Sequence, residues 1–149
     1  MRSSNLPLPH ALLALIEAKK WSRLGVPLVS LGKAAAQCLS PADDELVLMP
    51  PPFRTIAERV AGNRFWEGLS NVGQIDYERA LVIADFGIGS DSPIILYFGE
   101  ATEPSVMYLR WRWDDTGVVT HRWIETHATF AAFAVQVGLT NQPSHGVPS

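Results

Sequence analysis

The segment 80–95 constrains the fold of this chain more than any other; it reads Ala-Leu-Val-Ile-Ala-Asp-Phe-Gly-Ile-Gly-Ser-Asp-Ser-Pro-Ile-Ile. Two apolar runs flank a short polar turn, and each run is apolar at consecutive positions, as expected of a strand covered on both faces. Gly87 and Gly89 supply the backbone freedom of a tight turn, and Pro93 opens the second apolar run. The segment therefore predicts two central strands joined by a structured turn.

Two catalytic motifs overlap this turn, and neither has the surroundings that it needs. Asp85-Phe86-Gly87 is the metal-holding triplet of protein kinases, but the preceding residues contain no Gly-rich loop, strand lysine or His-Arg-Asp loop. Gly87 and Gly89 begin a dinucleotide-binding pattern, yet position 92 is serine and a strand follows instead of a helix. The sequence excludes both readings.

The first half of the chain predicts short helices. Apolar residues at helical spacing favour a helix over about residues 9–21, and a second, shorter helix is expected within 28–39. A brief strand is expected at 45–49. Three prolines at 50–52 then lead into a helical pattern that continues over 56–65.

The second half predicts strands at 81–86, 94–98, 105–113 and 118–125, followed by a helix that Thr129 caps and Gly138 ends. Helices first, consecutive antiparallel strands next and a helix last indicate an α+β fold. We expect a mostly antiparallel sheet in the C-terminal half, backed by the N-terminal helices and a C-terminal helix. One domain over 1–149 is expected, with flexible ends at 1–7 and 140–149.

Composition narrows the class of protein. Cys38 is the only cysteine, so no internal disulfide can form, and a reducing, cytoplasmic location is expected. No apolar run reaches the roughly 18–20 residues that a membrane span needs. The net charge of −3 argues against nucleic acid as the main partner and is compatible with a basic protein partner. The same charge is also what solubility alone requires.

The polar turn carries oxygen-bearing side chains at Asp85, Ser90, Asp91 and Ser92. One interpretation is a surface for a partner or small ligand; the other is turn chemistry, in which these side chains cap backbone amides. Carboxylate spacing is too sparse for a calcium loop, and the four histidines and Cys38 lack the spacing of a zinc site. Neither a metal nor a cofactor is expected, and no hydrolase elbow surrounds Ser90.

Two further segments are candidates for a partner face. The loop 99–104 carries Glu100 and Glu103, and the strand 105–113 carries Arg110 and Arg112 on the face of Tyr108. Aromatic and arginine side chains dominate protein–protein hot spots, although the tryptophans near these arginines also suit core packing. Two arginines are too few for nucleic acid binding by this chain.

Four strings of residues together carry a family likeness. They are Ile83-Ala-Asp-Phe-Gly-Ile-Gly-Ser-Asp-Ser-Pro-Ile-Ile-Leu96, Pro104-Ser-Val-Met-Tyr-Leu-Arg-Trp111, Arg122-Trp-Ile-Glu125 and Phe130-Ala-Ala-Phe133. The chain thereby resembles the bacterial branch of the SUKH superfamily, which includes the Smi/Knr cell-wall-assembly regulators and many immunity proteins. One departure is Leu96-Tyr97-Phe98, where such chains usually read Leu-Asp-Tyr, so any role of that aspartate is not carried over.

The resemblance implies an α+β fold and a non-catalytic binding role, in which an immunity protein masks a co-encoded toxin domain. The alternative within the family is a regulatory or scaffolding domain in envelope or stress physiology. A third hypothesis, from another class, is a small enzyme or ligand-binding protein that uses the turn 87–92. Under the first hypothesis, Asp85, Ser90, Asp91, Glu100, Glu103, Arg110 and Arg112 are the candidate partner-binding residues.

Overall fold

The structure is a computed structural model that describes residues 6–22, 29–40, 45–60, 75–86, 92–100, 102–113, 115–117 and 119–140. The helices are α1 (His10–Glu17), α2 (Gly32–Gln37), α3 (Ile56–Val60), the 3-10 helix η2 (Tyr77–Arg79) and α5 (Phe130–Gln136). The strands are β1 (Val29–Ser30), β2 (Val47–Leu48), β3 (Arg54–Thr55), β4 (Ala80–Asp85), β5 (Pro93–Tyr97), β6 (Ser105–Trp113) and β7 (Val119–His127).

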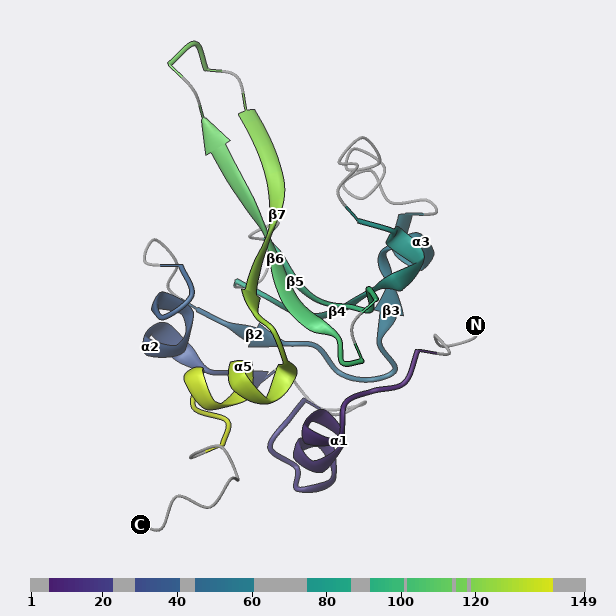
Figure 1. Ribbon diagram of the computed structural model, residues 1–149. Coiled ribbons are helices and arrows are strands. Elements are labelled where there is room, and N and C mark those ends of the chain that lie inside the picture. The colour runs from purple at the N-terminus through teal and green to yellow at the C-terminus, as the bar shows by residue number, and fades with distance from the viewer. Residues whose placement is uncertain are drawn as a thin grey trace.

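These strands form one antiparallel sheet in the order β1-β2-β4-β5-β6-β7, and β3 also pairs with β4. The longest strands come from the C-terminal half, and helices lie at both ends of the chain (Figure 1). The expected α+β architecture is therefore confirmed. Among the described strands β7 is the last one beyond β6, and the chain continues from β7 into α5.

β4 is the centre of the sheet, and its residues from Ala80 to Ala84 are buried. Side chains on its two faces enter two hydrophobic clusters. On one face Leu81 and Ile83 pack with residues of α1, α2 and α5; on the other, Val82 packs with Ile56 of α3. Burial on both faces explains why the sequence of this strand is continuously apolar rather than alternating.

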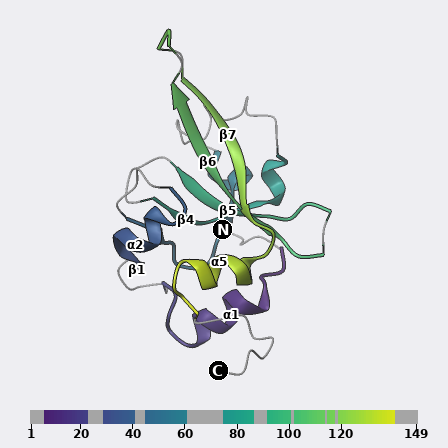
Figure 2. The same ribbon diagram turned by 60° about the vertical axis from the view of Figure 1, so that its left-hand side comes forward.

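α1 and α5 lie side by side under the first face of the sheet (Figure 2). Leu12 and Leu15 of α1 are buried at helical spacing, as the sequence pattern predicted. α5 begins at Thr129, whose hydroxyl accepts a hydrogen bond from the Ala132 amide at 3.2 Å. Gly138 follows its end with φ of +88°, a left-handed conformation that glycine adopts without strain.

β6 and β7 form a long two-stranded ribbon that projects beyond the rest of the sheet (Figure 1). Near its base, the two faces of the ribbon pack against different hydrophobic clusters. Tyr108 and Ile124 pack on the first cluster, and Leu109 and Trp123 pack on the second. This alternation confirms the predicted strand 105–113. The side chains of Trp111, Arg112 and Trp113 lie outside the described residues.

The N-terminal half departs from the sequence prediction in its details. The expected helix within 28–39 begins only at Gly32, because Val29 and Ser30 pair with β2. The two-residue strand β3 was not predicted, and it precedes α3. The remainder of the helical pattern expected over 56–65 lies outside the described residues. Strands of two residues have no periodicity of their own, so their pairing with a neighbouring strand decides them.

Candidate functional site

Asp85 and Ser92 are the members of the predicted polar turn for which the structure gives a position, and Asp85 is the one of them that was a candidate partner-binding residue. It lies half-buried at the end of β4, opposite Pro93, which begins β5. A carboxylate oxygen of Asp85 accepts a hydrogen bond from the Ser92 amide at 3.4 Å. This contact across the turn is what the turn-chemistry interpretation describes. The candidates Gly87, Gly89, Ser90 and Asp91 lie outside the described residues.

Asp85 also has an electrostatic role toward α3. Burial is the largest influence on Arg59, and it lowers the pKa of this guanidinium; the positive charge of Arg54 acts in the same direction. Asp85 and Glu58 act in the opposite direction and favour the charged form. Asp85 thus compensates a partly buried positive charge, and a substitution there would disturb the fold as well as any partner face.

The second predicted acidic segment forms a pocket. Glu100 and Glu103, from the loop between β5 and β6, lie with Glu125 of β7 around an open pocket of about 330 Å³. The remaining lining residues are Tyr97, Gly99, Ser105 and Ala128. All three glutamates are exposed. The sequence singled out Glu100 and Glu103 but not Glu125. Glu125 joins them through the register of β6 and β7, in which it lies opposite Met107.

The Arg79 guanidinium lies beside the acidic pocket, where it donates hydrogen bonds to the Phe98 and Gly99 carbonyls at 3.0 and 3.3 Å. Among the described residues the one ion pair is Arg79 with Asp76, and none of the three pocket glutamates takes part in it. The frame of the pocket is held in place by β5: the Tyr97 hydroxyl accepts a hydrogen bond from the Asp76 amide at 3.0 Å. Three exposed carboxylates that form no ion pair with a described residue, on a fixed frame, are suited to receive a cationic group from outside.

A second, larger pocket adjoins the first. It has a volume of about 520 Å³ and shares Glu103 with the acidic pocket. Its walls come from the start of α1, the β5–β6 loop and α5, and they are mostly apolar. The lining residues are Pro7, Leu8, Pro9, His10, Ala11, Phe98, Thr102, Glu103, Pro104 and Ala131. An apolar hollow beside a group of carboxylates matches a partner segment that carries both apolar and basic side chains.

The structure separates the predicted acidic residues into two groups. Asp85 is paired with Pro93, the first residue of β5, whereas Glu100 follows the last residue of β5. Five strand residues separate these ends, which corresponds to roughly 17 Å. Glu100 and Glu103 therefore belong together with Glu125, and Asp85 does not share their surface.

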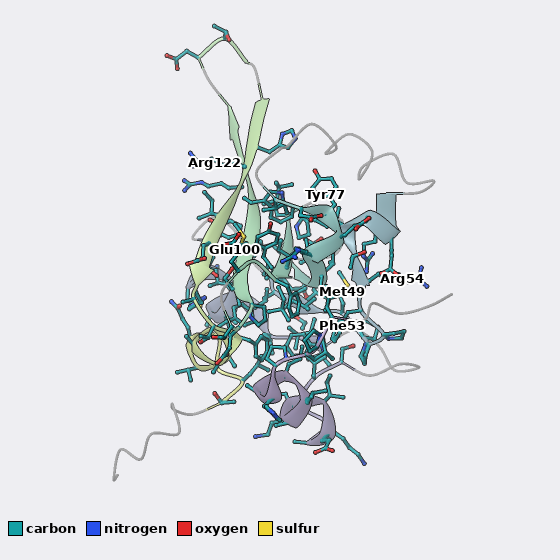
Figure 3. All side chains as sticks on the ribbon, turned by 45° about the vertical axis from the view of Figure 1, so that its right-hand side comes forward. Met49, Phe53, Arg54, Tyr77, Glu100 and Arg122 are labelled. Atoms are coloured by element: carbon teal, nitrogen blue, oxygen red, sulfur yellow. The ribbon has the colours of Figure 1, made fainter. Side chains whose placement is uncertain are left out.

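The predicted arginines lie on the projecting ribbon. Arg110 is exposed on β6 and is paired in register with Arg122 of β7, a residue that sequence reasoning did not single out. Arg112 is the next β6 residue on the same face, opposite Thr120, and its side chain is outside the described part. Figure 3 shows Arg122 high on the ribbon and Glu100 lower down, toward the body of the protein.

The side chains of His127 and Cys38 have structural contacts. The His127 ring contacts the Thr126 hydroxyl through Nδ1, at 2.9 Å, and the Gln136 side-chain oxygen through Nε2, so that it links β7 to α5. The Cys38 thiol donates a hydrogen bond to the Ala35 carbonyl at 3.0 Å. Partial burial raises the pKa of this thiol, against a smaller opposite effect of a backbone hydrogen bond. His145 lies outside the described residues.

Groups of three or more histidine, cysteine or acidic side chains with metal-binding geometry do not occur within the described residues. The helices found in that same part of the chain are all too short or too polar to cross a bilayer. Comparison of the chain with protein-family models, with curated proteins and with solved structures gave no match. The resemblance to the SUKH superfamily accordingly stays a prediction from the residues quoted above.

Proposed function

We propose that this protein is a non-catalytic protein-binding module that docks a basic partner over the pocket formed by Glu100, Glu103 and Glu125. The observation that carries the proposal is the convergence of these three exposed carboxylates around one open pocket, with none of them in an ion pair with another described residue. A lysine or arginine of the partner would pair with these carboxylates.

The surroundings of the acidic pocket support protein recognition over the binding of a simple cation. The adjoining apolar pocket shares Glu103, so one partner segment can place an apolar side chain in the larger hollow and a basic one beside the glutamates. Protein interfaces commonly combine an apolar centre with a charged rim in this way. The net charge of −3 also accelerates encounter with a positively charged protein.

In its finer form, the proposal is an immunity protein whose partner is a co-encoded toxin domain. The support for this form is the likeness of residues 83–96 and of the strings that follow to the bacterial SUKH proteins. The mechanism would be steric and electrostatic, because a rigid sheet edge and loop would cover the working face of the toxin. A regulatory or scaffolding domain without a toxin partner is the alternative function.

The test is affinity capture from the native lysate with the wild-type chain and with a charge-reversed variant. The variant carries Glu100→Lys, Glu103→Lys and Glu125→Lys. A matched control carries Glu17→Lys, Glu45→Lys and Asp115→Lys, three exposed acidic residues outside the pocket, so both proteins change net charge equally. We expect a basic protein to be captured by the wild type and the control and to be lost from the pocket variant.

Capture that is equal in all three proteins, or lost equally from both variants, would contradict docking at the acidic pocket. Expression of the captured partner alone then separates the two forms of the proposal. An immunity protein predicts that the partner arrests growth and that co-expression of the wild type, but not of the pocket variant, relieves the arrest. A partner without toxicity would favour the regulatory alternative.

A further inference from the structure

Two arginines face each other across the β6–β7 ribbon. Arg110 and Arg122 are directly opposite in the register of the two strands, and both side chains are exposed. The Cβ atoms of directly opposite residues lie about 4.5–5.5 Å apart, so two guanidinium groups share one small area of the surface. Like charges in this arrangement repel each other and destabilise the strand pair.

Nothing in the described part of the chain offsets this repulsion. The ion pair found there is Arg79 with Asp76, and neither Arg110 nor Arg122 donates a hydrogen bond to another described residue. Among the described residues the arrangement is therefore unfavourable, and an anionic group between the arginines would make it favourable.

The strand residues next to this arginine pair are packed on the core. The adjoining pair on the same face is Tyr108 with Ile124, and both pack on the first hydrophobic cluster. The buried Tyr108 ring meets Phe86 edge to face, with ring centroids 5.4 Å apart. The arginines thus lie on a strand pair that packs on the core, and Arg122 lies on the ribbon away from the helices (Figure 3).

We propose that Arg110 and Arg122 form a second binding site, which takes carboxylates from an extended acidic segment of a protein partner. Guanidinium groups bind carboxylates in a planar, two-pronged geometry, and in an extended segment acidic side chains at alternate positions project to one face, where they can meet two adjacent guanidiniums. Within the described residues β7 is the end strand of the sheet, so an extended segment can lie along its outer edge next to Arg122.

An acidic protein segment fits this surface better than nucleic acid does. Affinity for nucleic acid grows with the number of phosphates neutralised, and a chain of net charge −3 with two described arginines in one place offers few such contacts. The site is independent of the acidic pocket. Arg110 and Arg122 share the face of Tyr108 and Ile124, whereas Glu125 lies opposite Met107, which packs on the other cluster.

The test uses the full chain and a fluorescein-labelled oligo-L-glutamate of ten residues, with binding followed by fluorescence anisotropy at low ionic strength. The variants are Arg110→Gln and Arg122→Gln. The control is Arg54→Gln, which removes an exposed arginine from β3 and changes the net charge equally. We expect each ribbon variant to weaken binding roughly tenfold or more and the control to leave it within about twofold.

Thermal unfolding supplies the second readout, and it excludes loss of binding through loss of fold. Because the free protein carries the repulsion, Arg110→Gln should unfold at the same temperature as the wild type or higher. Arg110→Glu should raise it further by forming an opposite-charge pair with Arg122, and should abolish binding of the peptide. A ribbon variant that both unfolds at a lower temperature and loses binding would overturn the inference.

Three other outcomes would also overturn it. One is oligoglutamate binding that is absent from the wild type or equal in the wild type and the ribbon variants. Another is tighter binding of a ten-residue oligothymidylate than of oligoglutamate, which would make the site a nucleic acid surface. The third is salt-sensitive self-association in sedimentation velocity that Arg122→Gln removes, since the occupant would then be a second copy of this chain.

Discussion

The indole nitrogen of Trp21 donates a hydrogen bond to the backbone carbonyl of Met49 at 2.8 Å. This bond joins the segment after α1 to the end of β2, and the indole itself is almost fully buried. The ring lies against Phe53 and Phe130, with centroid distances of 6.3 Å and 5.8 Å. Trp21 therefore connects the N-terminal helix, the central sheet and α5 through one side chain.

Replacing Trp21 tests this connection. Trp21→Phe keeps an aromatic ring but leaves the Met49 carbonyl without its donor, and should lower the free energy of unfolding by about 1–3 kcal/mol. Trp21→Ala also opens a cavity among the aromatic rings and should cost about 3–5 kcal/mol. Urea unfolding followed by far-UV circular dichroism measures both. A Trp21→Phe variant as stable as the wild type would show that the hydrogen bond adds nothing to stability.

The start of α5 depends on the Thr129 side chain. Thr129→Ala removes the acceptor for the Ala132 amide and should cost about 0.5–2 kcal/mol in urea unfolding, whereas Thr129→Ser should keep most of that stability. Thr102→Ala, at an exposed loop position, is the matched control. Equal losses in Thr129→Ala and Thr129→Ser would point to the threonine methyl group instead of the cap.

Cys38 should react slowly with alkylating reagents although the residue is exposed. Its pKa is raised above the ordinary value of 9.0, so less thiolate is present at any given pH below it. Iodoacetamide labelling between pH 7.5 and roughly pH 10 should be slower in the folded protein than in urea, where the ordinary thiol pKa returns. Equal rates in the two states would contradict the raised pKa.

The same shift links Cys38 to stability at alkaline pH. Because the folded pKa lies above the unfolded one, the folded state holds its proton longer, and stability falls as pH rises from the ordinary value of 9.0 through the folded pKa. Burial also raises the pKa of Tyr77, which lowers stability over the same pH range. The effect of Cys38 is therefore measured as the difference in stability between the wild type and Cys38→Ser. The wild type should lose more stability than Cys38→Ser over this window; parallel curves would exclude the linkage.

Association with a basic partner should depend on the charge of the acidic pocket mainly through its rate. Rim charges steer encounter, so Glu125→Gln should lower the association rate constant more than it raises the dissociation rate constant, and added salt should reduce the difference. Surface plasmon resonance at two ionic strengths measures both constants. A salt-independent association rate would argue against electrostatic docking.

The long elements were predictable from the sequence because their patterns are local. β6 alternates between its two faces, α1 repeats leucines at helical spacing, and α5 has Thr129 at its start and Gly138 at its end. The two-residue strands β1 and β3 have no such pattern. Their pairing with β2 and β4 is set by the packing of distant parts of the chain, which single-sequence periodicity does not report.

The candidate site was predictable only in part, for a related reason. Glu100 and Glu103 stand out because they share one loop, but Glu125 joins them through the register of β6 and β7, including the irregularity between Val106 and Met107. The partnership of Arg110 with Arg122 depends on that same register. A shift of one residue would turn either side chain to the opposite face, so neither pairing follows from sequence spacing alone.

The central claim is that a basic partner docks over the acidic pocket, and hydrogen–deuterium exchange of the captured complex tests it most directly. The account predicts slower amide exchange in the complex than in the free protein over residues 97–105 and 125–128, the segments that line the pocket. The matched variant with Glu100→Lys, Glu103→Lys and Glu125→Lys should show no such change. A complex in which these two segments exchange as fast as in the free protein would contradict the account.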